Sequence, residues 1–246
     1  MRKLGCLMLA VCGCGGSNQQ SAATTSKSSQ PAPAVVKPAE NWVAVEMKPG
    51  WGIFVDPDGD CKQTWNGGTL SISVPGKQHE LQGNGKRNAP RLLVERTGDF
   101  AMSVRASGTL APKPSAAASK FVPYHGAGIL VWQSDQFFIR MERAKILTPD
   151  GQQITYLNFE GQNPSGGVPI KQARLNPDES VGLRVERRGN KIVGSISRDG
   201  ATWTPLGETV LPAAGPVKVG VAAVNSSDAP FAPEFSDFKF FEMKKP

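Results

Sequence analysis

Two short stretches of the sequence nearly repeat each other, and both place charged side chains at alternate positions. Ile139–Arg143 reads IRMER and Leu183–Arg187 reads LRVER. In a β-strand, successive side chains point to opposite faces of the sheet. Each stretch therefore has one apolar row for a core and one charged row. The charged rows hold Arg140 and Glu142 in the first copy, and Arg184 and Glu186 in the second.

A third segment, Ile154–Glu160 (ITYLNFE), alternates in the same way and adds Tyr156 and Asn158. If these strands lie in one sheet, we expect their polar rows to form one surface, which Trp132 joins across the hairpin. Charged groups hydrogen-bond sugar hydroxyls, and aromatic rings stack on pyranose faces, so this surface is a candidate carbohydrate site. For Tyr124 and His125, which open the Gly-rich segment YHGAG, packing is the favoured interpretation and a position on a rim loop is the alternative. The full set of candidates is Tyr124, His125, Trp132, Arg140, Glu142, Tyr156, Asn158, Arg184 and Glu186.

The other interpretation of the charged rows is structural. Opposite charges on neighbouring strands form a ladder in which each pair contributes roughly 0.2–1 kcal/mol. The two interpretations are compatible, because a ladder also preorganises a binding site.

Catalysis is the rival to binding. Retaining glycoside hydrolysis needs two carboxyl groups about 5–5.5 Å apart, and a hydrolase here would have to use Glu142 and Glu186 from adjacent strands. An arginine beside each favours the ionised form, which suits a general acid poorly. We therefore expect a non-catalytic protein.

The segment Asp56–Cys61 (DPDGDC) raises the question of a metal. Asp56, Asp58 and Asp60 stand at alternate positions and offer oxygen ligands to calcium. The favoured interpretation is a Pro-Asp-Gly turn whose aspartates cap backbone amides, with no cofactor. Cys61 is expected to be a small buried side chain, because no His or Arg adjoins it in sequence.

The elements that position these residues are predicted to be strands. The chain contains 27 Gly and 20 Pro, and its apolar runs are short and rich in Val, Ile and Phe. No helical pattern of 10–15 residues alternates with them. Many short strands separated by turns predict an all-β sandwich or barrel.

The first forty residues have a different character. Residues 1–13 are predicted to be a signal peptide, with Arg2 and Lys3 before a short apolar run. Val11–Cys14 resembles the lipobox of bacterial lipoproteins, which implies lipid attachment at Cys14 and anchoring in the cell envelope. By the same resemblance, Gly15 after the lipidated cysteine favours the outer membrane in a Gram-negative cell.

Residues 14–40 are predicted to be a lipidated cysteine followed by a disordered tether, because they are rich in Ser, Thr, Gln, Ala and Pro. Residues 41–246 then form one domain. Of the four cysteines, only Cys61 falls in that domain, so no internal disulfide is expected. Loss of Arg2 and Lys3 lowers the formal charge from +7 to +5. The basic residues are scattered, which argues against a nucleic-acid partner.

Seven segments along the domain carry a resemblance to a known family. They are DPDGDC (Asp56–Cys61), LSISVPGKQHEL (Leu70–Leu81), NAPRLL (Asn88–Leu93), GDFAMSV (Gly98–Val104), Tyr124–Ala144, SRDGATW (Ser197–Trp203) and Val219–Phe240. Together they resemble a bacterial family of unknown function, domain-of-unknown-function family 1349. The resemblance implies a concanavalin A-like jelly roll, a two-sheet antiparallel β-sandwich of about a dozen strands. It also implies a relation to the sandwich domain of some β-xylosidases.

Carbohydrate binding is the usual inference for this fold, by analogy. The expected function is a lipid-anchored, non-catalytic module that binds glycan or another cell-envelope component. The alternative is a structural or protein-interaction domain.

Overall fold

The computed structural model describes residues 42–82, 85–114 and 122–243. The predicted signal peptide (1–13) and tether (14–40), with Cys14, lie outside the described residues. Fifteen strands and no helix make up the regular structure of the described part. Nothing in that part is a helix long and apolar enough to cross a membrane.

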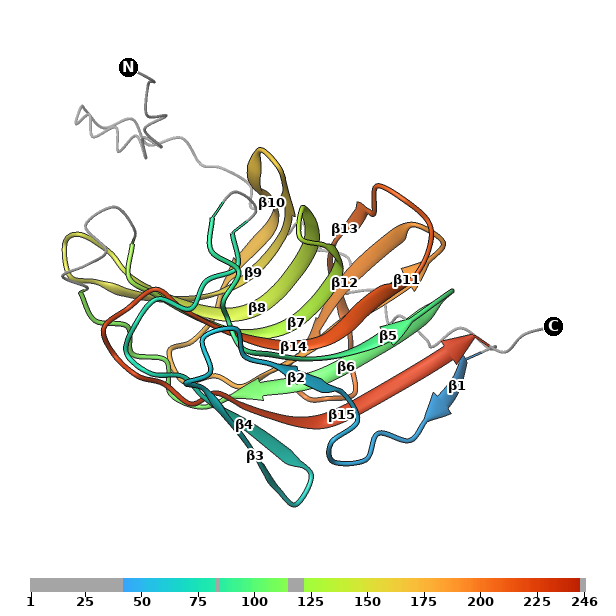
Figure 1. Cartoon of the computed structure of the whole chain (residues 1–246), viewed down its shortest axis with the longest axis horizontal. Coiled ribbons are helices and arrows are strands. Elements are labelled where there is room, and N and C mark those ends of the chain that lie inside the picture. The colour runs from blue at the N-terminus through green and yellow to red at the C-terminus, as the bar shows by residue number, and fades with distance from the viewer. Residues whose placement is uncertain (1–41, 83–84, 115–121, 244–246) are drawn as a thin grey trace, which may run out of the picture. The chain divides into compact units, whose positions relative to one another are not determined.

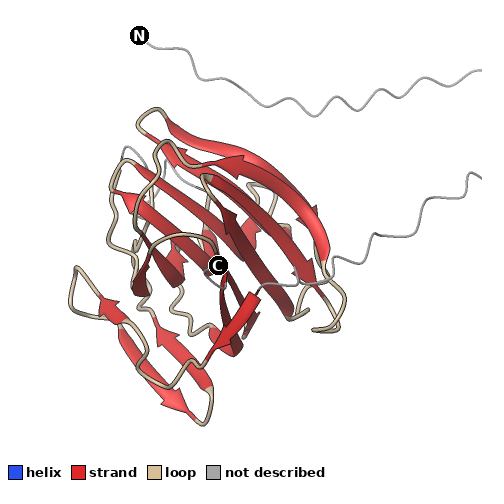
Figure 2. Ribbon diagram, turned by 90° about the vertical axis from the view of Figure 1, so that its right-hand side faces the viewer, coloured by secondary structure: helices blue, strands red, loops and turns tan. Residues whose placement is uncertain are grey.

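The strands form two antiparallel sheets (Figure 2). This confirms the predicted all-β sandwich. The seven-stranded sheet runs β10 (Gly166–Arg174), β9 (Gln153–Asn163), β8 (Phe137–Leu147), β7 (Tyr124–Ser134), β14 (Val217–Asn225), β5 (Arg91–Arg96), β2 (Ile53–Val55). The eight-stranded sheet runs β13 (Thr204–Val210), β12 (Lys191–Ser197), β11 (Val181–Arg188), β6 (Phe100–Ser107), β15 (Glu234–Met243), β4 (Thr69–Ser73), β3 (Lys62–Asn66), with β1 (Trp42–Val45) on β15.

The core lies between the two sheets and is built from the apolar rows. Met141 of β8 and Leu183 of β11 are fully buried in the same hydrophobic cluster. Burial of such a side chain contributes about 1.5–3 kcal/mol to stability. Truncation of Met141 to Ala should cost about 2–5 kcal/mol.

The two copies of the repeated pattern belong to different sheets. IRMER lies in β8 of the seven-stranded sheet, and LRVER lies in β11 of the eight-stranded sheet. Because their apolar rows share one core, their charged rows face opposite sides of the sandwich. The expectation of one common surface is therefore wrong for Arg184 and Glu186. Alternation decides which face of its own strand a residue takes, but it does not decide which sheet the strand joins.

The final arginine of each copy has a structural position that the sequence comparison did not assign. Arg143 is 1% exposed and donates hydrogen bonds to the backbone carbonyls of Glu179 (2.7 Å) and Gly108 (2.8 Å). Arg187 is 2% exposed and donates to the carbonyl of Gly189 (2.8 Å). Both continue the apolar row of their strand, so they lie on the inner face, where they satisfy carbonyls of connecting segments.

Candidate functional site

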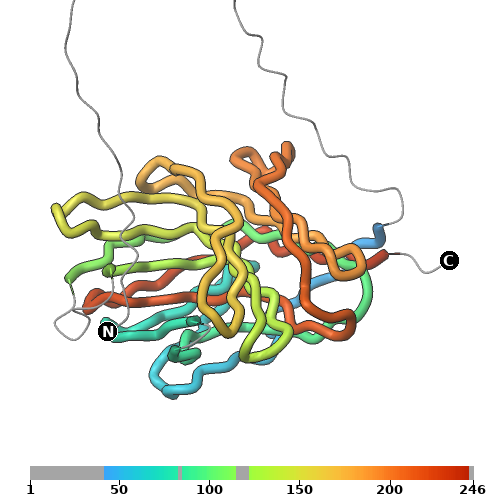
Figure 3. The backbone as a smooth tube through the Cα atoms, turned by 90° about the horizontal axis from the view of Figure 1, so that it is seen from above, coloured from blue at the N-terminus to red at the C-terminus, as the bar shows by residue number. Residues whose placement is uncertain are grey.

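The candidate site is the outer face of the seven-stranded sheet, on the side away from the core. Strands β7, β8 and β9 supply it as successive antiparallel neighbours, which can be followed from light green to yellow in Figure 3. The register places Arg140 between Leu130 and Glu160, and Glu142 between Gly128 and Asn158. We call the following set the outer face: Tyr124, Leu130, Trp132, Phe138, Arg140, Glu142, Tyr156, Asn158, Glu160 and Gln162.

A connected polar network occupies the middle of the outer face. The Tyr124 hydroxyl donates a 2.6 Å hydrogen bond to Oε2 of Glu142. The Arg140 guanidinium lies 3.6 Å from the same carboxylate and forms a second ion pair with Glu160. Gln162 donates a 2.7 Å hydrogen bond to Glu160. Arg140 is 8% exposed and Glu142 is 1% exposed, so the network is largely sealed from water.

The network shifts its acidic groups in opposite directions. Burial raises the pKa of Glu142 above its usual range, against the opposing effects of Arg140 and Tyr124. Burial acts in the same sense on Glu160, but the Arg140 charge and several hydrogen bonds outweigh it, so that its pKa is lowered. Burial disfavours the Arg140 charge, but the two carboxylates more than compensate and its pKa is raised. The site thus holds one permanently charged guanidinium in a fixed position.

An aromatic pair adjoins the network. Trp132 and Phe138 face each other across the β7–β8 pairing, with ring centroids 4.6 Å apart and an interplanar angle of 11°. The Arg91 guanidinium lies 4.8 Å from the Trp132 ring centroid. Leu81 packs on the same apolar cluster, so the segment before β5 covers this part of the outer face.

The outer face opens to solvent at one pocket of about 160 Å³. Tyr124 and Arg140 contribute to it from the sheet, and the Glu80 carboxylate is fixed by a 3.1 Å hydrogen bond from Ser226. The lining therefore combines a guanidinium, a carboxylate and a phenol with apolar side chains. The lining residues are Glu80, Leu81, Gln82, Val122, Tyr124, Arg140, Val224 and Ser226.

Of the nine predicted sugar-binding candidates, six lie on this face and three do not. Tyr124, Trp132, Glu142, Tyr156 and Asn158 lie on it with Arg140, and Asn158 accepts a hydrogen bond from Gln172 (3.2 Å). His125, Arg184 and Glu186 do not. Glu160 has the signal that would have found it, since it ends the polar row of Ile154–Glu160.

His125 points into the core because it follows Tyr124 by one residue at the start of β7. Its side chain is 0% exposed and stacks on Phe231 at 4.3 Å. The amide of Ala111 donates to Nδ1 (3.2 Å), so Nε2 carries the proton and donates to the carbonyl of Ala229 (3.2 Å). Burial lowers the pKa of His125 to about 4. The alternative of a rim-loop position is therefore wrong for this residue.

Arg184 and Glu186 form a local ion-pair row on the other sheet. Glu186 contacts Arg184 at 3.3 Å and Arg188 at 2.6 Å. All three residues lie on β11, so this row runs along one strand and is not the predicted cross-strand ladder. The ladder's cross-strand pairing occurs instead between Arg140 and Glu160 of β8 and β9. Arg184 also lies 5.8 Å from the Trp203 ring centroid. Glu142 and Glu186 face opposite sides of the sandwich, so they are not a catalytic pair.

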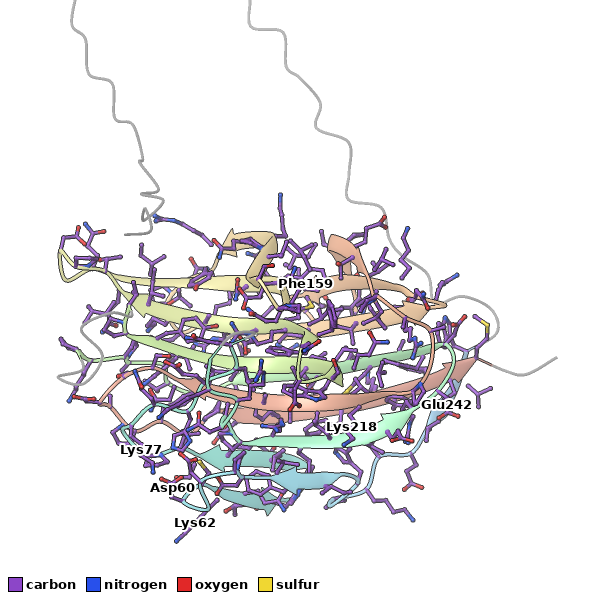
Figure 4. The ribbon with its side chains drawn as sticks, turned by 45° about the horizontal axis from the view of Figure 1, so that its top comes forward. Asp60, Lys62, Lys77, Phe159, Lys218 and Glu242 are labelled. Atoms are coloured by element: carbon purple, nitrogen blue, oxygen red, sulfur yellow. The ribbon has the colours of Figure 1, made fainter. Side chains whose placement is uncertain are left out.

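The Asp56–Cys61 loop caps a backbone amide as predicted for Asp56, whose Oδ2 accepts a 2.7 Å hydrogen bond from the Cys61 amide. The other two aspartates contact side chains instead. Asp58 accepts a hydrogen bond from Asn88 (2.7 Å), and Asp60 pairs with Lys77 at 2.5 Å. Figure 4 labels Asp60 and Lys77 in the same region of the sandwich. His79, which is distant in sequence, lies against Cys61 (3.8 Å), so the expectation drawn from sequence neighbours missed it.

Comparison with solved structures shows the same fold. A protein of unknown function from Saccharomyces cerevisiae is 17% identical, with 80% of this chain and 98% of that chain covered and a TM-score of 0.61. The GH43 protein BlXynB of Bacillus licheniformis is 14% identical over 86% of this chain, with a TM-score of 0.53. A xylan β-1,4-xylosidase of Bacillus halodurans C-125 is 11% identical over 82% of this chain, with a TM-score of 0.50.

This chain spans 40% of the length of each of the last two proteins. No curated protein sequence matches it. A family model described as a protein of unknown function, DUF1349, matches residues 63–243. That match covers most of the sandwich, and the chain belongs to the DUF1349 family.

Proposed function

We propose that the protein is a non-catalytic carbohydrate-binding module that takes a sugar unit in the pocket on the outer face. The observation that carries this proposal is the pocket itself, where Arg140, fixed by Glu142 and Glu160, meets solvent beside Tyr124. A guanidinium donates to sugar hydroxyls, and the Glu80 carboxylate, which also lines the pocket, accepts from them. Because the network holds Arg140 before any ligand arrives, little ordering entropy is lost on binding.

The volume of the pocket limits the size of the ligand. A volume of about 160 Å³ is smaller than the several hundred Å³ typical of drug-sized ligand sites. We therefore infer recognition of a single sugar residue or a chain end. The similarity to the xylan β-1,4-xylosidase supports a saccharide ligand, since that protein is named for action on xylan.

Catalysis is disfavoured because a substrate has poor access to the carboxylates. Glu142 and Glu160 have oppositely shifted pKa values on neighbouring strands, a pattern typical of an acid and a nucleophile. A general acid must come within hydrogen-bond reach of the leaving oxygen. Glu142 is 1% exposed, accepts from Tyr124 and does not line the pocket. Its role in the proposal is to position Arg140.

The lipobox at Val11–Cys14 supports the rest of the proposal, which is attachment of the module to the cell envelope through lipid at Cys14. Two or more acyl chains anchor a protein stably without a transmembrane helix. The partner would then be a glycan or another envelope component within reach of the tether.

A glycan-array screen with the full chain in detergent tests the binding proposal. Arg140→Met keeps the length of the side chain and removes the charge, and Arg184→Met makes the same change at the matched position of the second sheet. We expect binding that Arg140→Met reduces at least about tenfold, which corresponds to roughly 1.4 kcal/mol, and that Arg184→Met leaves intact.

A second variant guards against misfolding of Arg140→Met. Val122 is 48% exposed at the pocket, so Val122→Glu should block the pocket without disturbing the core. Binding to no glycan, or binding that survives both Arg140→Met and Val122→Glu in folded protein, contradicts the proposal. Saturable binding to a protein that sugars do not displace would instead identify an interaction domain.

A further inference from the structure

A second cluster of chemically active side chains lies outside the outer face. It joins the Asp56–Cys61 loop to His79 in the segment before β5. Cys61 Sγ lies 3.7 Å from Asp60 Oδ1 and 3.9 Å from His79 Nε2, and Asp60 Oδ1 lies 3.4 Å from His79 Nε2. We propose that Asp60, Cys61 and His79 bind a divalent transition-metal ion of the zinc class.

The three separations fit a common ion. Zinc binds sulfur at about 2.3 Å and nitrogen or oxygen at about 2.0–2.2 Å in tetrahedral geometry, which places ligand atoms roughly 3.3–3.8 Å from one another. The observed separations of 3.4–3.9 Å lie at or close to that range. Cys61 Sγ is also 3.8 Å from His79 Nδ1, so binding requires rotation of the thiol toward the Nε2 side.

The hydrogen bonding of His79 determines which ring nitrogen would bind the metal ion. Nδ1 lies 3.4 Å from the carbonyl oxygen of Asn88, which can only accept a hydrogen bond, so Nδ1 is the nitrogen that carries the hydrogen. The lone pair is then on Nε2, which faces Asp60. Metal-binding histidines commonly donate their second ring nitrogen to a carbonyl in this way.

Asp56, in the same loop but outside the group of three, carries a carboxylate oxygen that a small loop movement would offer as a fourth ligand. Its Oδ2 accepts from the Cys61 amide, whereas its Oδ1 is buried and has no hydrogen-bond partner among the described residues. A buried oxygen without a partner is costly, and an ion would satisfy it. Lys77 occupies Oδ2 of Asp60 and leaves Oδ1 to the cluster.

The donor set points away from calcium. Calcium takes oxygen ligands, whereas a thiolate and an imidazole select zinc and related ions. His79 is 0% exposed and Cys61 is 8% exposed, but the Asp60 side chain is 31% exposed and provides the entry path. His79 directly precedes the Glu80–Gln82 wall of the pocket, although the metal proposal does not depend on sugar binding.

Cobalt(II) is the probe, because a thiolate bound to cobalt gives a charge-transfer band in the near ultraviolet. The protein to be tested is the full chain in which Cys6, Cys12 and Cys14 are replaced by Ser, so that Cys61 is its single thiol. We expect a band that saturates at one equivalent of Co²⁺ and disappears when zinc is added. The same additions should raise the Tm of the protein.

Three variants in this background decide the result. Cys61→Ser should abolish the band, and Asp60→Asn should weaken cobalt binding by about tenfold or more. Asp58→Asn, a neighbouring aspartate outside the cluster, should leave cobalt binding unchanged. The proposal is overturned if the folded parent gives no band or if the band persists in Cys61→Ser. Should Cys61→Ser not fold, unchanged cobalt affinity in Asp60→Asn overturns it.

Discussion

The Tyr124 hydroxyl and the Glu142 carboxylate, 18 residues apart in sequence, are joined by a 2.6 Å hydrogen bond on the outer face of the seven-stranded sheet. Two glycines of β7 allow this contact, because the register places Gly128 opposite Glu142 and a Cβ on Gly126 would overlap the Tyr124 ring. Tyr124 therefore reaches over the strand and satisfies a carboxylate that is 1% exposed. The same carboxylate forms an ion pair with Arg140, which lines the pocket. The Tyr124 hydrogen bond therefore helps to fix the position of the guanidinium in the pocket.

Removal of that hydroxyl should destabilise the protein. Tyr124→Phe leaves a buried carboxylate with one donor fewer, and the expected cost is about 1–3 kcal/mol of unfolding free energy. Urea unfolding at pH 7 measures it. Tyr156→Phe is the matched control and should cost less. Equal stability of Tyr124→Phe and the wild type would show that the hydrogen bond contributes nothing.

Acid should weaken the fold through His125. Its pKa falls from 6.5 to about 4 on folding, chiefly because it is buried. The folded state keeps it neutral while the unfolded state gains a proton, so stability is lost as pH falls from about 6.5 to about 4. The loss is about 3 kcal/mol by linkage.

His125→Gln retains polar atoms for Ala111 and Ala229 but cannot titrate. The variant should therefore lose less stability than the wild type between pH 7 and pH 4, as urea unfolding at each pH measures. Parallel pH profiles for the two proteins would mean that His125 is not the titrating group.

The two buried arginines that end the repeated motifs should differ in importance. Arg143 donates to three carbonyls, those of Glu179, Gly108 and Pro177. Arg187 donates to one, and its buried Nη1 has no partner in the described part of the chain. Arg143→Met should cost about 3 kcal/mol, and Arg187→Met about 1 kcal/mol or less. A larger loss for Arg187→Met in thermal or urea unfolding would contradict this ranking.

Close strand packing at Gly128 should forbid a side chain. A Cβ there would lie 2.0 Å from the carbonyl oxygen of Met141, which is backbone and cannot move aside. Gly128→Ala should destabilise by about 1–3 kcal/mol. A Cβ on Gly161 of β9 would have no heavy atom within 4 Å, so Gly161→Ala is the control and should leave the stability unchanged. Similar Tm values for the two variants would refute the packing argument.

The proposed lipid anchor at Cys14 predicts a clear fractionation result. Cys14→Ser should move the protein from the membrane fraction to the soluble fraction in a bacterial host, because acyl chains supply the attachment. Cys12→Ala should leave it in the membrane fraction. Membrane association that survives Cys14→Ser would refute anchoring at this cysteine.

Alternation along single strands could be read from the sequence with success. The rows at Phe137–Arg143 and Ile154–Glu160 predict which side chains face the core and which face the outer side of the sheet. Met141 and Phe159 lie in the core, and Arg140 and Asn158 lie on the outer side, as expected. The reason is local, since the geometry of a strand fixes opposite faces for successive residues. The all-β class follows in the same way from short runs bounded by turns.

Which strands become neighbours was decided only by the tertiary structure. The near identity of IRMER and LRVER suggested one surface, yet the chain sends β8 and β11 to different sheets, and Glu160 rather than Glu186 pairs with Arg140. The approach of His79 to Cys61 is of the same kind. Such contacts depend on the pairing and crossing of distant segments, which is set by the packing of the whole core, whereas alternation depends only on the geometry of a single strand.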